Sequence, residues 1–200
     1  PVRNILIVNT NASLWDSRFE QIVPNLYVDH VEQRQFDHGG TRAAMADASD
    51  ADLLLFMTQD AIPADEMLVE HLVMQFSLPQ VKAAYARQLP KPGCSTLEAY
   101  TRGFNYPPES DIKDYGDLPK LGLKTFFCSN VCAMYDRKVY EELGGFVTHT
   151  IFNEDMIYAA GLIEAGYSIA YAADAQVYHS HNYGCIAQMK RNFDLGVSQA

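Results

Sequence analysis

The stretch Asp52-Leu53-Leu54-Leu55-Phe56-Met57-Thr58-Gln59-Asp60 is the most informative part of the sequence. Its four consecutive apolar residues, Leu53 to Phe56, predict a strand that is buried on both faces, as in the sheet of an α/β protein. The carboxylate of Asp60 follows where this strand should end. Because ligands of α/β sheets bind at the carboxyl ends of the strands, the stretch predicts both a fold class and the place of a site.

Strands and helices alternate on both sides of this stretch. Further strands are expected at residues 5–8, 26–31, 81–86, 125–135, 167–172 and 176–178, and helices at 13–22, 41–48, 64–76, 137–143 and 154–165. The alternation predicts an α/β fold with a mostly parallel central sheet flanked by helices. Residues 89–123 hold several prolines and no clear period, which predicts a long functional loop or lid.

Length and composition limit the classes of protein that fit. A chain of 200 residues suits one domain, residues 1–200, and its net charge of -10 argues against binding the phosphate backbone of a nucleic acid. A single nucleotide ligand stays compatible, because a metal ion and backbone amides neutralise one diphosphate locally. The four cysteines form no Cys-x-x-Cys pair, which predicts reduced thiols and a cytoplasmic protein. No apolar run approaches 18 residues, so no transmembrane segment is expected in this chain.

Three side chains are candidates for a metal site. Asp60 offers hard oxygen ligands for Mg²⁺ or Mn²⁺, although an aspartate before Pro63 also suits an ordinary turn. His179 and His181 stand two apart after a short strand, so both rings can share one face. A lone histidine is more often structural, whereas a pair two residues apart after a strand suits metal binding and a structural role equally well.

Glu154-Asp155 opens an expected helix and supplies a candidate general base. The simpler interpretation is that two acidic residues in a first turn complement the helix dipole. Asn153 is the expected side-chain cap of this helix. The residues alone leave both interpretations open.

Three other segments could contact a ligand. The loop Asp37 to Arg42 contains two glycines and enters a helix, which suits either a phosphate site or an ordinary turn. Ser129 and Asn130 are polar residues in an apolar run and need partners, either a sugar or backbone groups. Gly145 belongs to a Gly-Gly pair that either approaches a substrate or ends a helix.

Seven short segments, taken in order, resemble the family 2 glycosyltransferases of the GT-A fold, particularly their bacterial rhamnosyltransferase-like branch. In chain order they are Phe36-Asp37-His38-Gly39-Gly40-Thr41-Arg42, Phe56-Met57-Thr58-Gln59-Asp60-Ala61-Ile62-Pro63, Phe104-Asn105-Tyr106-Pro107-Pro108-Glu109-Ser110, Phe127-Cys128-Ser129-Asn130-Val131, Glu141-Glu142-Leu143-Gly144-Gly145-Phe146, Glu154-Asp155-Met156 and Tyr178-His179-Ser180-His181-Asn182-Tyr183. The resemblance covers nearly the whole chain. Each segment is weak by itself, and their common order carries the resemblance.

The resemblance implies a role for each acidic and imidazole candidate. Asp60 matches the last aspartate of the family's Asp-x-Asp metal motif, with Thr58 where the first aspartate usually stands. Asp155 matches the catalytic base, and His179, 24 residues later, matches the histidine that completes the metal site in several members. His181 is the weaker candidate ligand. The implied cofactor is therefore a divalent metal, Mn²⁺ or Mg²⁺.

The resemblance also places the substrates. Residues expected near the nucleotide diphosphate are Asn9, Asp37, Arg42 and Gln59. Residues expected near the donor sugar or the acceptor are Ser129, Asn130, Gly145 and Glu154. The implied reaction is an inverting, single displacement, in which a sugar, rhamnose in the branch resembled, passes from a nucleotide-diphosphate donor to a saccharide or lipid-linked acceptor during synthesis of a bacterial surface polysaccharide. A lipid-linked acceptor would place the protein at the inner face of the membrane.

Two departures from the family pattern support a competing hypothesis. Asn9 stands where an aspartate usually helps to hold the nucleotide, and Ala43 replaces a usual asparagine. The family's first strand, upstream of Ile5 to Val8, is missing, which predicts truncation at the N-terminus. A degenerate, non-catalytic binding module is therefore the alternative. A metal-dependent phosphoester hydrolase is a third hypothesis, although the chain lacks the clustered ligands that a two-metal site needs.

Overall fold

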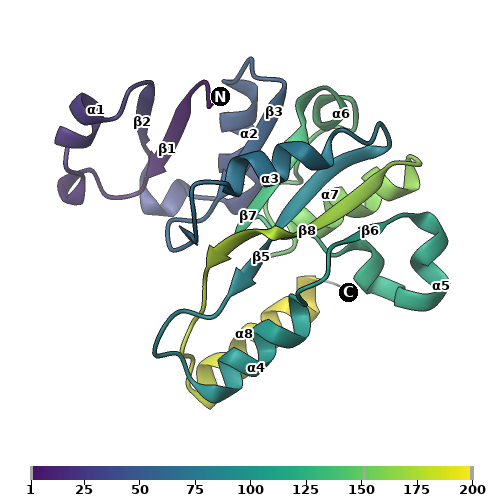
Figure 1. Ribbon diagram of the computed structural model, residues 1–200. Helices are drawn as coiled ribbons and strands as arrows, with labels where there is room; N and C mark the ends of the chain where they lie inside the picture. The colour runs from purple at the N-terminus through teal and green to yellow at the C-terminus, as the bar shows by residue number, and fades with distance from the viewer. Residues whose placement is uncertain (1, 151, 199–200) are drawn as a thin grey trace.

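The computed structural model describes residues 2–150 and 152–198, which form two sheets and their covering helices (Figure 1). The strands are β1 (Ile5–Asn9), β2 (Leu26–His30), β3 (Leu53–Met57), β4 (Ile62–Pro63), β5 (Val81–Leu89), β6 (Asp111–Lys113), β7 (Cys132–Asp136) and β8 (Ser168–Tyr178). The α-helices are α1 (Arg18–Ile22), α2 (His38–Asp47), α3 (Leu68–Gln75), α4 (Thr96–Asn105), α5 (Leu118–Leu121), α6 (Arg137–Glu142), α7 (Glu154–Glu164) and α8 (Cys185–Ser198).

The main sheet is mixed, which corrects the expected mostly parallel arrangement. Its strand order is β3-β7-β5-β8-β4, with β6 paired to β8. Only β5 and β8 run parallel in it, and the other pairs are antiparallel; β1 and β2 form a separate parallel pair. The prediction was wrong because an apolar run reports burial on both faces, and β3 and β7 are covered in this way while running antiparallel.

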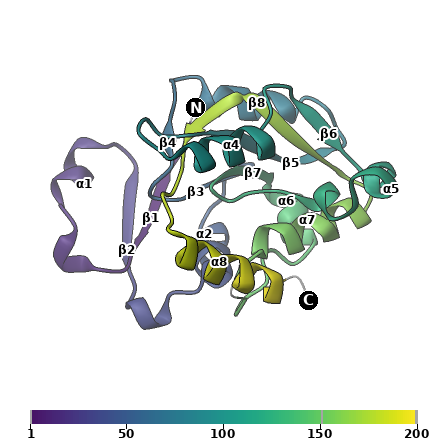
Figure 2. The ribbon, with the colours of Figure 1, turned by 90° about the horizontal axis from the view of Figure 1, so that it is seen from below.

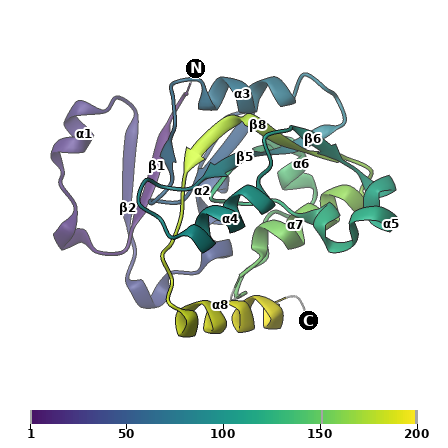
Figure 3. The ribbon, with the colours of Figure 1, turned by 60° about the horizontal axis from the view of Figure 1, so that its bottom comes forward.

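Each face of the main sheet carries its own apolar cluster, and successive strand residues alternate between them. Tyr135 of β7 points into an aromatic cluster that α7 covers, whereas Met134 points into an aliphatic cluster that α3 covers. Figure 3 shows α3 on one side of the sheet and α7 on the other. Figure 2 shows β1, β2 and α1 together at one edge of the molecule. The two clusters fix the sheet, and therefore the loops at its ends.

Two of the expected elements have different bounds in the structure. Instead of a strand over 125–135, the chain forms a 3-10 helix at Gly122–Phe126 and then a turn, and β7 begins at Cys132. Ser129 and Asn130 therefore lie in the loop that precedes β7, not within a strand. The two expected strands at 167–172 and 176–178 are one strand, β8, whose pairing with β5 shifts between Ala86 and Arg87.

Residues 89–123 are more regular than expected, because they contain α4, β6 and α5. The helix α4 was not predicted because its apolar residues face solvent and its charged residues face the protein, the reverse of an ordinary amphipathic helix. Its apolar side chains Leu97, Tyr100 and Phe104 are 64–71% exposed, while Glu98 and Arg102 face inward with side-chain exposures of 12% and 15%. Because burying charged side chains is costly unless they have partners, the inward-facing charges of α4 are expected to interact with other polar residues of the protein.

Candidate functional site

Asp60, His179 and His181 converge at one end of the main sheet. Asp60 follows β3 and precedes β4, and β4 pairs with the end of β8 through Ile62 and Tyr178, so this register brings Asp60 close to the histidines that follow β8. The Oδ2 atom of Asp60 lies 3.4 Å from Nε2 of His179 and 3.5 Å from Nε2 of His181. One ligand atom from each of the three residues lies within 4.8 Å of the others.

The electrostatics of this cluster favour a cation. His179 is 5% exposed, and burial lowers its pKa to about 4, so its ring is neutral at pH 7. Burial also lowers the pKa of His181. Burial raises the pKa of Asp60, but His179, a hydrogen bond from Thr58 and His181 together outweigh burial, and the net pKa is below the usual value. The cluster therefore presents one carboxylate and two neutral imidazoles.

This donor set fits a divalent metal ion. Carboxylate oxygen suits Mg²⁺ and Mn²⁺, while neutral imidazole nitrogen suits transition metals, so Mn²⁺ satisfies both ligand types. The three groups come from two separate segments that the sheet holds in register. All three were candidates from the sequence, and the structure brings all three together.

Asp155 lies in the first turn of α7, and backbone amides hold its carboxylate. The amide of Asn130 donates to Oδ2 at 2.9 Å, and the amide of Met156 donates to Oδ1 at 2.8 Å. Burial and the neighbouring Glu154 carboxylate raise the pKa of Asp155 to about 6, although the two amides act in the opposite direction. A carboxyl group with this pKa can hold or release a proton close to neutral pH.

Glu154 is 6% exposed and forms the centre of a buried polar network. Its Oε1 accepts from Nη1 of Arg42 at 2.8 Å and from the side-chain amide of Asn130 at 3.2 Å. Asn130 also accepts from the Tyr135 hydroxyl at 2.9 Å. The expected side-chain cap of α7 is absent, since Asn153 has a positive φ of 70° and makes no capping hydrogen bond. The network therefore anchors the turn that carries Asp155.

The predicted phosphate loop forms the start of α2. Asp37 caps this helix by accepting from the Gly40 amide at 2.6 Å, and its other oxygen accepts from the His149 amide at 3.1 Å. A Cβ atom at Gly39 would lie 1.8 Å from the Val147 carbonyl oxygen. Gly39 is therefore required by close packing of the 147–149 segment against the helix.

A cleft of about 320 Å³ lies between this helix start and the β1–β2 pair. Its lining residues are Val8, Asp29, Val31, Gln35, Asp37, Gly40, Thr41, Ala44, Met45, Thr148 and His149. Of the residues expected at the nucleotide, Asp37 lines this cleft. Asn9 lies at the end of β1, where its side-chain amide donates to the Asn11 carbonyl at 2.9 Å. Gln59 is exposed beside Asp60.

The remaining predicted residues have structural contacts. Ser129 accepts from Nε2 of Gln88 at 3.1 Å. Gly145 has a φ of 68° after α6, and a Cβ atom there would lie 3.0 Å from the Tyr140 ring, so the backbone turn favours glycine. The position of Gly145 matches the helix-stop interpretation.

The sequence matches the family model described as glycosyl transferase family 2 over residues 16–144. The chain belongs to glycosyl transferase family 2. Two curated relatives are an O-antigen chain rhamnosyltransferase, RfbN, from Salmonella typhimurium and another, WbaN, from Salmonella anatum. They are 47% and 42% identical over 88% and 98% of this chain. The chain spans 56% and 62% of their respective lengths.

Solved structures confirm the GT-A fold of this family 2 chain. A mannosyltransferase from Pyrobaculum calidifontis, in complex with GDP-Man and Mn²⁺, matches 88% of this chain and 47% of its own at a TM-score of 0.62 and 15% identity. GalNAc-T7 with UDP, GalNAc and Mn²⁺ matches 88% of this chain and 37% of its own, at a TM-score of 0.62 and 13% identity. At these identities the likeness establishes the fold alone.

Sequence reasoning missed Gln88 and Glu98, which contact the candidate metal ligands His179 and His181, and Arg102, which joins Gln88 to Glu98. Gln88 accepts from Nδ1 of His179 at 2.8 Å and from Nη1 of Arg102. Glu98 accepts from Nε of Arg102 at 2.7 Å. One signal was available: Glu98 and Arg102 are four residues apart with opposite charges, which is typical of a helix. Nothing in the sequence connected that pair to His179.

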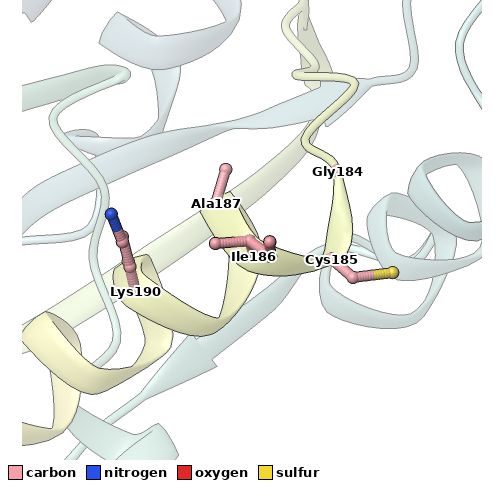
Figure 4. A pocket seen from close by; sticks show the side chains of 5 residues that line it. All are labelled: Gly184, Cys185, Ile186, Ala187 and Lys190. Carbon is pink, nitrogen blue, oxygen red and sulfur yellow. The ribbon is translucent and has the colours of Figure 1, made fainter.

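A second hollow, of about 600 Å³, lies at the start of α8 (Figure 4). Its lining residues are Gly184, Cys185, Ile186, Ala187 and Lys190, all from one segment. None of the site residues predicted from the sequence lines this hollow. Among residues 2–150 and 152–198, no helix combines the length and the apolar character that crossing a bilayer requires.

Proposed function

We propose that this chain is the catalytic region of an inverting glycosyltransferase that moves rhamnose from a nucleotide-diphosphate donor to a saccharide or lipid-linked acceptor in O-antigen synthesis. The convergence of Asp60, His179 and His181 on one point carries the proposal, because a degenerate module has no need of such a donor set. The two Salmonella relatives, both O-antigen chain rhamnosyltransferases, support the choice of sugar and of polysaccharide. A cytoplasmic location, with a lipid-linked acceptor at the inner face of the membrane, is part of this proposal.

Asp60, His179 and His181 would hold the divalent metal. When bound, the metal would supply positive charge that stabilises the departing nucleotide diphosphate. The protein's contribution is to keep the two imidazoles neutral and the carboxylate ionised, so that all three groups face the ion as ligands. Mn²⁺ is the ion that we expect, since it accepts both imidazole and carboxylate ligands.

Asp155 would accept the proton of the acceptor hydroxyl. The amides of Asn130 and Met156 each take one lone pair of its two oxygens, which orients the carboxylate and leaves further lone pairs for the hydroxyl. With a pKa of about 6, the group is mostly ionised above pH 7 and still basic enough to take a proton. Attack opposite the leaving group in one displacement then inverts the anomeric centre.

The cleft between α2 and the β1–β2 pair would receive the nucleoside. Asp29, Asp37 and Thr41 offer hydrogen-bonding groups around it. Arg42 contacts Glu154 and the His38 carbonyl through Nη1, and no hydrogen bond of its Nε or Nη2 is found in the described part of the chain. These two donors are the ones that we propose for a phosphate, so Arg42 would link the donor to the turn that carries Asp155.

Incubation of the purified chain with thymidine-diphosphate rhamnose, Mn²⁺ and an O-antigen repeat acceptor tests the proposal. We expect transfer that requires Mn²⁺ and gives a product whose anomeric configuration, read by NMR, is opposite to that of the donor. Retention of configuration would overturn the inverting mechanism. Release of the sugar at the same rate without acceptor would favour a hydrolase.

A thermal-shift series separates an inactive enzyme from a binding module. The chain is melted with thymidine, uridine and guanosine diphosphates, each with and without Mn²⁺. A ligand at a hundred times its Kd stabilises the folded protein by about 2.7 kcal/mol, which raises the Tm of a chain of this size by several degrees. Stabilisation without transfer would favour the non-catalytic module, and no stabilisation by any nucleotide would count against a donor site in this chain.

A further inference from the structure

Gln88 is a fully buried polar side chain that contacts His179 from the side opposite Asp60. It is 2% exposed at the end of β5. Its Oε1 accepts from Nδ1 of His179 at 2.8 Å and also faces Nη1 of Arg102. Its Nε2 donates to the Tyr106 hydroxyl at 2.6 Å and to the Ser129 hydroxyl at 3.1 Å. Both ends of the amide are therefore hydrogen-bonded in one orientation.

Arg102 determines which way the Gln88 amide faces. A guanidinium group only donates hydrogen bonds, so the Gln88 atom that faces it must be the oxygen. The same oxygen faces Nδ1 of His179, and an oxygen acceptor requires that Nδ1 carries the ring proton. In a neutral imidazole the other nitrogen then has no proton. That nitrogen, Nε2, is the atom that lies 3.4 Å from Oδ2 of Asp60.

Glu98 fixes Arg102 and also holds the second histidine. Its Oε1 accepts from Nε of Arg102 at 2.7 Å and from the backbone amide of His181 at 3.3 Å. The amide of Ser95, the cap of α4, donates to Asn182 Oδ1 at 2.9 Å. The inward-facing charged side of α4 is thus attached at several points to the segment that carries both histidines.

We propose that Glu98, Arg102 and Gln88 are positioning residues that hold the His179 ring with its proton on Nδ1, so that unprotonated Nε2 faces Asp60 as a metal ligand. The proposal rests on the metal site of the proposed function. Histidine ligands generally donate their second ring N–H to an oxygen acceptor, and loss of that acceptor typically lowers metal affinity by about 10–100-fold. If the Gln88 amide were reversed, its NH₂ would face Nδ1, and the proton would move to Nε2.

The tautomer can be measured directly on the metal-free protein. In protein labelled with ¹⁵N-histidine at pH 7.5, multiple-bond ¹H–¹⁵N correlation spectra distinguish the two tautomers, and the His179→Gln variant identifies the signal of His179. We expect protonated Nδ1 in the wild type and a mixture of tautomers in Arg102→Met. Protonated Nε2 in the wild type, or an unchanged tautomer in both Arg102→Met and Gln88→Met, would overturn the proposal.

Affinity for Mn²⁺ alone, titrated by electron paramagnetic resonance, is the second readout. We expect Arg102→Met and Gln88→Met to weaken binding by about 10–100-fold. Gln88→Glu keeps an acceptor oxygen toward both Arg102 and His179, so it should stay within a few-fold of the wild type. The matched control is Arg137→Met, which removes another arginine paired with a glutamate four residues away, on α6. If a Gln88 variant fails to melt cooperatively, Arg102→Met and Glu98→Gln carry the comparison.

The two readouts separate failure of this proposal from failure of the proposed function. If wild-type protein binds no Mn²⁺ but His179 carries its proton on Nδ1 and loses that preference in Arg102→Met, the positioning role stands and the metal site is wrong. If wild-type protein binds Mn²⁺, Asp60→Asn abolishes binding, and the Arg102 and Gln88 variants bind like wild type, the metal site stands and the positioning role is wrong.

Discussion

Asp60 and Asp155 are the same residue type in opposite surroundings. Asp60 faces two imidazole rings, and its pKa lies below the usual value despite partial burial. Asp155 lies beside a second carboxylate, Glu154, and burial and repulsion raise its pKa to about 6. Surroundings that push two carboxyl groups apart in this way commonly mark two different chemical roles. Asp60 is suited to stay charged beside a cation, and Asp155 is suited to exchange a proton.

Replacement of Asp155 should give the largest effect. Asp155→Asn keeps the size of the side chain and an acceptor oxygen but removes the base, so we expect transfer to fall by about 10²–10⁴-fold, the usual contribution of a general base. Affinity for Mn²⁺ should stay near the wild-type value. Asp174→Asn, an exposed aspartate on β8, is the matched control. Transfer at the wild-type rate in Asp155→Asn would exclude Asp155 as the base.

Replacement of Asp60 should affect metal binding, in contrast to replacement of Asp155. Asp60→Asn removes the only charged ligand of the cluster, and we expect affinity for Mn²⁺ to fall by about a hundredfold, since even outer partners of ligands contribute about 10–100-fold. Transfer should fall with it and recover in part at high Mn²⁺, whereas Asp155→Asn should not recover. Calorimetric titration of Mn²⁺ checks the binding, and unchanged affinity would place the metal elsewhere.

The different surroundings explain what could be predicted from the sequence. Asp60, His179 and His181 were recognisable because each follows a predicted strand. The structure adds the register, Ile62 with Tyr178, that brings those strand ends together. The partners of Asp155 and His179 were not recognisable. Gln88 looked like an ordinary residue after a strand, and Arg102 lies on α4, whose exposed apolar residues concealed its inward charges. Contacts between loops that are distant in sequence leave no periodic signal.

The direction of the sheet was mispredicted for a related reason. The run Leu53 to Phe56 correctly predicted apolar packing on both faces of the strand, although only Leu54 is fully buried, and α3 and α7 belong to the two clusters that supply the cover. Strand direction depends instead on how the chain returns between strands. The segment between β5 and β7 contains α4, β6, α5 and two 3-10 helices in place of a single crossover helix, and it brings β7 back antiparallel to β5.

The dependence of transfer on pH should follow Asp155 and not Asp60. Because the pKa of Asp155 is about 6, the transfer rate at saturating donor and Mn²⁺ should be constant above pH 7. Below pH 6 it should fall about tenfold per pH unit as the base becomes protonated. Binding of Mn²⁺, measured at each pH, controls for loss of the metal. A rate that stays constant down to pH 4.5 would mean that the base has an ordinary pKa or is another group.

The smallest effect should appear in stability, with opposite signs for the two carboxylates. The folded protein holds the Asp155 proton up to about pH 6, whereas an unfolded chain releases it near 3.8, so the contribution of this group to stability falls as pH rises through that window. Above pH 6 the carboxyl group is charged in both the folded and the unfolded protein, and the folded protein bears the full destabilisation from the buried charge. A shift of about two pKa units corresponds to roughly 1–3 kcal/mol. Asp155→Asn turns an NH₂ group toward one of the two backbone amides, which costs stability at every pH. The Tm of the variant relative to the wild type should therefore be several degrees higher at pH 7.5 than at pH 4.

For Asp60→Asn, the Tm difference from the wild type should change with pH in the opposite direction. The pKa of Asp60 is lowered in the folded protein, so its charge contributes stability above the unfolded pKa, and that contribution is lost as pH falls. Removal of the charge should lower the Tm at pH 7.5, measured without metal. If the Tm differences of both variants changed in the same direction between pH 4 and pH 7.5, the contrast between the two carboxylates would not arise from their surroundings. Asp155→Asn would then owe its change in stability to packing around Asn130 and the start of α7.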